Sequence, residues 1–139
     1  MSVIKMQMKK LNLYLIGVFV LMFLSTTLLG QKSEIKTSDL IGCWTDSREE
    51  NLPKSNLNIY RSCDYKEYPF SRFRFKMDLR DDFTCSWYHL SSNDRHSMRE
   101  GIWTFNNETH ILTLFDLEGR IVKKFSIAEL NEDIMKIKI

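Results

Sequence analysis

Glycine, proline and cysteine are all scarce in this sequence. Its 139 residues contain five glycines, two prolines and three cysteines. Collagen-like and low-complexity chains are rich in glycine and proline, so the composition excludes both classes. Three cysteines are also too few for a small domain that is held together by a network of disulfides. The length corresponds to one domain.

The sequence also lacks an excess of charge of either sign. It has 20 Lys and Arg against 18 Asp and Glu, a net charge of +2. Lys5, Lys9 and Lys10 lie in the first ten residues, so residues 31–139 hold 17 basic and 18 acidic side chains. Nucleic-acid binding requires a basic face, and the near-neutral body therefore argues against nucleic acid as the main partner.

Motifs that carry well-known chemistry are missing as well. The five glycines never cluster into a phosphate-binding loop, and there is no Gly-x-Ser-x-Gly nucleophile elbow. No Cys-x-x-Cys or His-Glu-x-x-His spacing offers a metal site. We therefore expect a protein without an enzymatic activity, a cofactor or a bound metal.

The first thirty residues are organised like a secretory signal peptide. A polar, basic segment precedes an apolar run at residues 13–24, and small residues up to Gly30 follow it. We predict a signal peptide at residues 1–30, a short linker at 31–37 and one domain at 38–139. An uncleaved anchor is the alternative, because residues 13–29 reach the lower limit of about 17 residues for a membrane span. The first interpretation implies export to the periplasm or the extracellular space, with no stable membrane span after cleavage.

The body of the chain is typical of a series of short strands. The clearest alternation of apolar and charged residues lies at 72–77, where Phe73, Phe75 and Met77 share one face. We expect eight strands, at residues 43–49, 57–60, 72–77, 83–89, 101–105, 111–115, 121–129 and 134–139. One helical turn at residues 37–42 should precede them.

Eight strands joined mostly by short loops favour an all-β, up-and-down antiparallel barrel. An open sheet of this size would leave two exposed edges, and closure into a barrel removes both of them. A β-sandwich is the alternative. An eight-stranded barrel has an interior that side chains or one small ligand can fill.

A resemblance supports the barrel. Gly42-Cys43-Trp44 follows the predicted helical turn and opens the first strand, as the Gly-x-Trp element does in lipocalins. Tyr68-Pro69-Phe70 and Gly101-Ile102-Trp103 also look like segments of small secreted bacterial lipocalin-like proteins. The resemblance covers residues 38–139 and implies that Trp44 is buried at the closed end of the barrel, with no implied reaction.

Several side chains are candidates for structural roles. Cys43 and Cys63 would close a disulfide ring if their Cα atoms lie within about 7 Å, and Cys85 should be a buried thiol. Either Glu49 or Glu50 should pair with Arg61, Arg72 or Arg74, and Glu49 and Arg72 are the candidates for structural roles. Trp103 is expected in the core.

Two functional interpretations remain open, and an enzyme of unknown reaction is a weaker third. The first is a binding protein whose cavity, lined by Phe75, Trp87 and Phe115, holds a small apolar molecule. The second is a filled barrel that interacts with another envelope protein. We expect the open end to be ringed by Glu50, Leu52, Asp81, Asp82 and the turn at residues 106–107, and the tyrosines of the loop at 61–71 to be structural.

Overall fold

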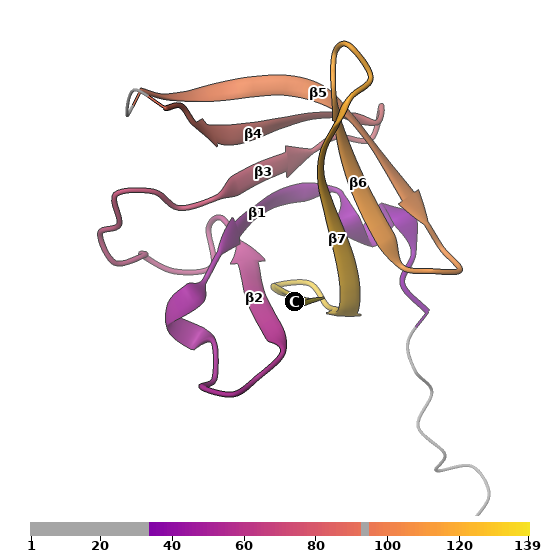
Figure 1. Cartoon of the computed structure of the whole chain (residues 1–139). Helices are drawn as coiled ribbons and strands as arrows, with labels where there is room; N and C mark the ends of the chain where they lie inside the picture. The colour runs from indigo at the N-terminus through magenta and orange to yellow at the C-terminus, as the bar shows by residue number, and fades with distance from the viewer. Residues whose placement is uncertain (1–33, 93–94) are drawn as a thin grey trace, which may run out of the picture. The chain divides into compact units, whose positions relative to one another are not determined.

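The computed structural model describes residues 34–92 and 95–139, and these form a closed, eight-stranded antiparallel β-barrel (Figure 1). This confirms the all-β barrel and rules out the sandwich. The predicted signal peptide and the first residues of the predicted linker lie outside the described residues. Within the described part of the chain, no helix is long and apolar enough to cross a membrane.

The strands are separated by short turns, except between the first and the second and between the second and the third. The elements are η2 (Thr37–Leu40), β1 (Gly42–Asp46), η3 (Arg48–Glu50), β2 (Leu57–Ser62), β3 (Lys76–Leu79), β4 (Thr84–Leu90), β5 (His96–Asn106), β6 (Ile111–Asp116), β7 (Ile121–Leu130) and β8 (Ile134–Lys138). Both η elements are single 3₁₀ turns, and η2 is the helical turn expected from the sequence.

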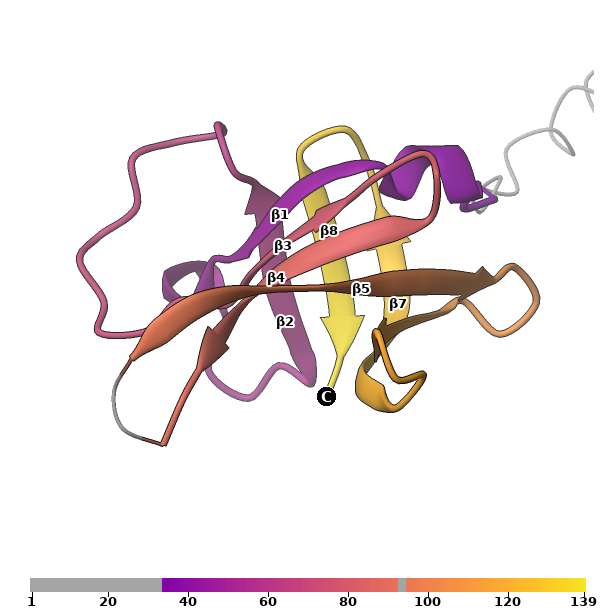
Figure 2. The same ribbon diagram turned by 90° about the horizontal axis from the view of Figure 1, so that it is seen from above.

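The strand order around the barrel differs from a simple meander in one place. Its order is β1-β2-β8-β7-β6-β5-β4-β3, so β1 lies between β2 and β3, and β2 pairs with β8. Residues 63–75 therefore connect β2 to β3 by crossing outside β1, and we call this segment the crossover connection. In Figure 2 it stands away from the strands as a wide loop.

Alternation of side chains places the core inside the barrel. Along β3 and β4, the buried residues Met77, Leu79, Cys85 and Trp87 share one face because Met77 is opposite Trp87 and Leu79 is opposite Cys85. The ordered strand β3 begins at Lys76, later than the alternation at residues 72–77 predicts. Phe75, immediately before it, is still buried on the same face.

The turn η2 closes one end of the barrel. Leu40 is fully buried, and the indole Nε1 of Trp44 donates a hydrogen bond to the Leu40 carbonyl over 2.9 Å. Ile35, which we placed in the linker, is only 5% exposed and belongs to the core. Trp44 is 3% exposed, which agrees with the burial implied by the lipocalin resemblance.

Two turns that we expected at the open end lie at this closed end instead. The Thr37 hydroxyl donates a hydrogen bond to Asn107 Oδ1, which places the β5–β6 turn beside η2. Asp81 and Asp82 follow Leu79, and Leu79 is opposite Gly42 at the start of β1. The error came from chain direction, since the crossover connection reverses the sense of β3 and of every strand after it. Glu50 and Leu52 follow β1 and lie at the other end, as expected.

The crossover connection is fixed at several points. Cys43 and Cys63 form a disulfide with a Cα–Cα distance of 5.4 Å, which confirms the predicted pairing and ties the start of the connection to β1. The Tyr68 hydroxyl donates a hydrogen bond of 2.8 Å to the Ser62 carbonyl. Thr45 and Asp46 of β1 both donate hydrogen bonds to the Phe75 carbonyl at its far end. The loop tyrosine Tyr68 thus has the structural role that we expected.

Candidate binding pocket

The centre of the barrel is filled by its own side chains. Fully buried residues from the six strands β3 to β8 occupy it: Met77, Leu79, Cys85, Trp103, Leu112, Leu114, Ile127 and Met135. Trp103 donates its indole hydrogen to the Arg80 carbonyl over 3.0 Å, so this core tryptophan is fully satisfied. Burial raises the pKa of the Cys85 thiol to about 11, which keeps it protonated and inert, as expected for a core cysteine.

A layer of aromatic side chains packs next to this core. The rings of Tyr60, Phe75 and Phe125 meet at centroid distances of 5.8 to 6.4 Å. Lys123 is on the inward face of β7, and its Nζ lies 4.2 Å from the centroid of Phe75. Burial lowers the pKa of Lys123, and the carboxylate of Asp46 partly opposes that shift.

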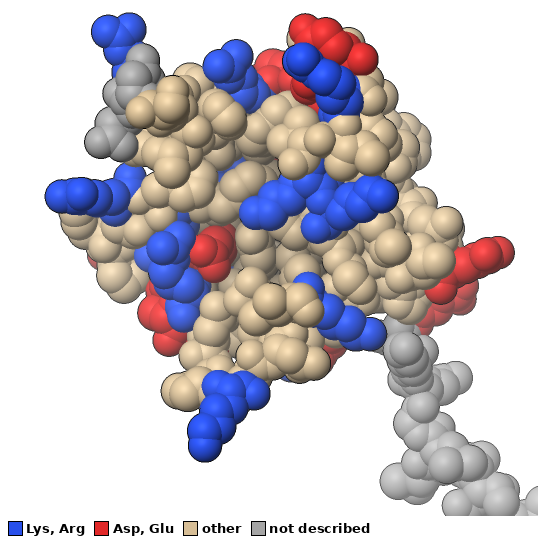
Figure 3. Space-filling model, in the orientation of Figure 1, with Lys and Arg blue, Asp and Glu red and all other residues tan. Residues whose placement is uncertain are grey.

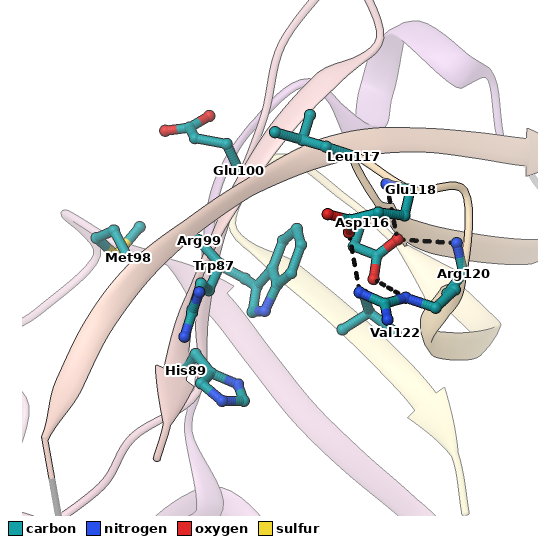
Figure 4. Close-up of a pocket in the computed structure, with 10 residues that line it drawn as sticks. All are labelled: Trp87, His89, Met98, Arg99, Glu100, Asp116, Leu117, Glu118, Arg120 and Val122. Atoms are coloured by element: carbon teal, nitrogen blue, oxygen red, sulfur yellow. Dashed lines mark hydrogen bonds and ion pairs between the residues drawn. The ribbon is translucent and has the colours of Figure 1, made fainter.

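A pocket of about 490 Å³ opens beside this layer, between the β4–β5 hairpin and the β6–β7 turn (Figure 4). Its apolar residues are Trp87, Met98, Leu117 and Val122. Its polar and charged residues are His89, Arg99, Glu100, Asp116, Glu118 and Arg120. The volume falls within the range of about 300–1,000 Å³ that small-molecule sites occupy.

Unequal strand lengths create the pocket. β5 begins at His96, whereas the last residue of β6, Asp116, is opposite Gly101. The first five residues of β5 therefore pair with β4 alone, and the space that a longer β6 would fill is left open.

The β6–β7 turn is held by a network centred on Asp116. Its Oδ1 accepts hydrogen bonds from the backbone N–H groups of Glu118 and Arg120, and its Oδ2 accepts one from the Arg120 side chain. Gly119 has a φ of 78°, a conformation that glycine adopts at little cost. Burial alone would raise the pKa of Asp116, but the hydrogen bonds and charge of Arg120 lower it. Acidic and basic side chains accordingly lie close together over this turn in Figure 3.

Trp87 forms the wall of the pocket nearest the core. It is 4% exposed, and its ring lies so close to Gly101 that a Cβ atom there would come within 2.8 Å of the indole. The same Cβ would also collide with the carbonyl oxygen of Phe115. Position 101 therefore has to be glycine for the indole to lie against β5.

The polar groups of the pocket are unequally satisfied. Arg120 pairs with Asp116 at 2.7 Å and with Glu118 at 2.9 Å, and Glu100 pairs with Arg80 at 3.2 Å. By contrast, Arg99 makes no hydrogen bond or ion pair with any residue that the structure describes. The indole Nε1 of Trp87 is buried and likewise has no hydrogen-bond partner within the described ranges.

A second cluster of charges lies outside the barrel, between η3 and the crossover connection. Arg61 pairs with Glu50 at 2.8 Å, Arg74 pairs with Glu49 at 3.0 Å, and Lys66 lies 3.0 Å from Glu50. The Arg61 hydrogen bond is the main reason that the pKa of Glu50 falls to about 2, against an opposing effect of burial. The sequence predicts an arginine partner for one of the two glutamates, and in the structure both have one. The partner of Glu49 is Arg74, however, while Arg72 is exposed and forms no ion pair with a described residue.

The structure places the three residues predicted to line a cavity in three different environments. Trp87 lines the pocket, as expected. Phe75 is buried in the aromatic layer and does not reach the pocket wall. Phe115 is opposite Ile102, which is 47% exposed, so Phe115 lies on the outer face of the barrel. Leu112 and Leu114 are the inward residues of β6, and the face assigned to Phe115 was wrong.

Sequence reasoning missed the charged residues of the pocket. Arg99 and Arg120 lie between the strands that the sequence predicts, in the connections at residues 90–100 and 116–120. The segment Asp116-Leu117-Glu118-Gly119-Arg120 does carry a local turn signal, but only the register of β5 against β6 shows what the turn faces. Among the described residues, no three His, Cys, Asp or Glu side chains come together as metal ligands.

Comparisons with known proteins identify no family for this chain. The chain matches no protein-family model and shows no significant similarity to a curated protein or a solved structure.

Proposed function

We propose that the chain is an exported, non-catalytic lipocalin-like protein that binds a small molecule in the pocket beside Trp87. The observation that carries the proposal is the open volume of about 490 Å³ beside a tightly packed core. Pockets of this size with an aromatic wall and a few polar groups are typical of ligand sites. The ligand would lie at the rim of the barrel, because side chains occupy its centre.

Two features support export. The first thirty residues are organised like a signal peptide, and the disulfide between Cys43 and Cys63 is of a kind that persists outside the reducing cytoplasm. The barrel would then act in the periplasm or outside the cell.

The test uses a neutral fluorescent probe, N-phenyl-1-naphthylamine, whose emission increases in apolar surroundings. We expect the mature protein to bind one equivalent. Val122→Trp should weaken binding at least about tenfold because the larger side chain fills the pocket. Leu52→Trp is the matched control, since Leu52 is 72% exposed and lies outside the pocket. Equal binding by both variants would contradict the assigned site.

A second candidate function is an interaction module that contacts another envelope protein. One observation favours it: Ile102, Phe115 and Ile121 are adjacent across β5, β6 and β7 on the outer face, and Ile102 and Ile121 are 47% and 56% exposed. Native mass spectrometry of protein purified from its own host separates the two functions. A retained small molecule supports the binding protein, whereas empty protein with a co-purifying partner supports the interaction module.

A further inference from the structure

The pocket beside Trp87 contains two unused hydrogen-bond donors. Trp87 and Arg99 are opposite each other on β4 and β5, so both side chains lie on the same face of the sheet. Among the residues that the structure describes, the buried Nε1 of Trp87 has no acceptor and Arg99 has no carboxylate partner. A buried donor without a partner is destabilising, and an acceptor atom on a bound ligand would remove that cost.

Each carboxylate of the pocket already has a basic partner. Asp116 and Glu118 share Arg120, and Glu100 is paired with Arg80. Arg99 is therefore the pocket cation without an ion-pair partner in the described part of the chain. Lys123, which follows the pocket residue Val122 on the inward face of β7, likewise forms no ion pair with a described residue.

Figure 4 shows how these groups are placed. The five-membered ring of Trp87, which carries Nε1, is turned toward Arg99 and His89 and away from the Asp116–Arg120 ion pair. Trp87, Arg99 and His89 each have an N–H group that can donate a hydrogen bond, and none of the three carries a carboxylate. The apolar side chains of Met98, Leu117 and Val122 complete the wall around them.

We infer that the pocket binds an amphipathic organic anion, with its acidic group at Arg99 and the Trp87 Nε1–H and its apolar body against Val122 and Leu117. The inference rests on the proposed function and adds the class of ligand to it. Arginine recognises carboxylates, sulfonates and phosphates through charge-assisted hydrogen bonds, and an indole N–H donates to the same oxygen atoms.

Two probes with one ring system test the charge directly. 1-Anilinonaphthalene-8-sulfonate has the skeleton of N-phenyl-1-naphthylamine plus one sulfonate group. We expect the sulfonate probe to bind at least about tenfold more tightly than the neutral one, the effect of one charge-assisted hydrogen bond. Arg99→Gln should remove that preference by weakening the sulfonate probe more than the neutral probe. Arg72→Gln is the matched control, because Arg72 is exposed and lies outside the pocket.

The three tryptophans give a second readout. The sequence has only Trp44, Trp87 and Trp103. The indole N–H groups of Trp44 and Trp103 already donate to the carbonyls of Leu40 and Arg80. In nitrogen-15-labelled protein, the sulfonate probe should shift the indole resonance of Trp87 downfield and leave the other two in place. Trp87→Phe assigns the resonance and should weaken the sulfonate probe more than the neutral one.

The outcomes separate this inference from the proposed function. If the neutral probe binds and Val122→Trp abolishes its binding, but the sulfonate gives no gain and the Trp87 indole resonance does not move, the anion preference is overturned and the binding function stands. If neither probe responds to Val122→Trp, both proposals fail. Thermal unfolding of Arg99→Gln and Arg72→Gln should match the parent protein, so that a lost preference reflects the site and not the fold.

Discussion

Replacing Glu50 with glutamine should remove much of the acid sensitivity of this protein. The carboxylate of Glu50 accepts hydrogen bonds from Arg61, Lys66 and the Ser47 hydroxyl, and its side chain is 26% exposed. These contacts lower its pKa from 4.5 to about 2. Because the folded-state pKa is the lower one, the contribution to stability is complete above the unfolded-state value and is lost as the pH falls toward about 2.

The magnitude follows from the pKa difference. At about 1.4 kcal/mol per pKa unit, the shift corresponds to about 3 kcal/mol. Because the side chains of Glu50 and Arg61 are 26% and 16% exposed, solvent screens the pair. A contribution of about 1–2 kcal/mol is therefore expected.

Urea unfolding at about pH 6 and about pH 2.5 measures this contribution, and urea leaves the ionic strength unchanged. Glu50→Gln should lower the free energy of unfolding at the higher pH and lose less of it on acidification than the parent does. Glu108→Gln, in the exposed β5–β6 turn, is the control and should behave like the parent. If Glu50→Gln and the parent lose equal free energy between the two pH values, the assigned role of the Arg61–Glu50 pair is refuted.

Three further predictions test the fold. Trp44→Ala should lower the free energy of unfolding by about 3–5 kcal/mol, since it leaves a cavity at a fully packed position of the closed end. A loss below about 1 kcal/mol would mean that Trp44 is not part of the core. Cys63→Ser should cost about 3 kcal/mol in denaturant unfolding because the disulfide spans 20 residues, and reduction of the parent protein should give the same loss. Lys123→Met should raise the melting temperature at neutral pH, because burial lowers the pKa of Lys123 and so disfavours its charged form. That gain should shrink as the pH rises toward the ordinary pKa of lysine, where the parent no longer carries this charge. Destabilisation by Lys123→Met at neutral pH would instead mean that the contact with Phe75 outweighs burial.

The strands could be predicted from sequence because each one alternates on its own. Met135 and Ile137 in β8, and Cys85 and Trp87 in β4, are buried on the predicted faces. Alternation fails where both faces are apolar, as in β6. Leu112, Leu114 and Phe115 are all apolar, and only the pairing of Leu114 with Trp103 reveals which face is inward.

The pocket and the strand order could not be predicted, because both depend on contacts between distant segments. Nothing local indicates that β1 pairs with β3, more than 30 residues later, and this pairing decides which turns lie at which end. Arg72 and Arg74 are equivalent in the sequence pattern. The structure distinguishes them because Arg74 also donates to the carbonyls of Asp46 and Pro69, which direct it toward Glu49.

The crossover connection also divides the barrel into two parts that are each continuous in sequence. One is the β1–β2 hairpin, closed on itself by the Cys43–Cys63 disulfide, and the other is the six-stranded meander β3–β8. The hairpin lies between the two edges of the meander, pairing with β3 on one side and β8 on the other. The segment at residues 63–75 is the only covalent link between the two parts. A chain cut there would yield two complementary fragments, each presenting the strand edges that the other needs, which is the arrangement that a split-protein reporter requires.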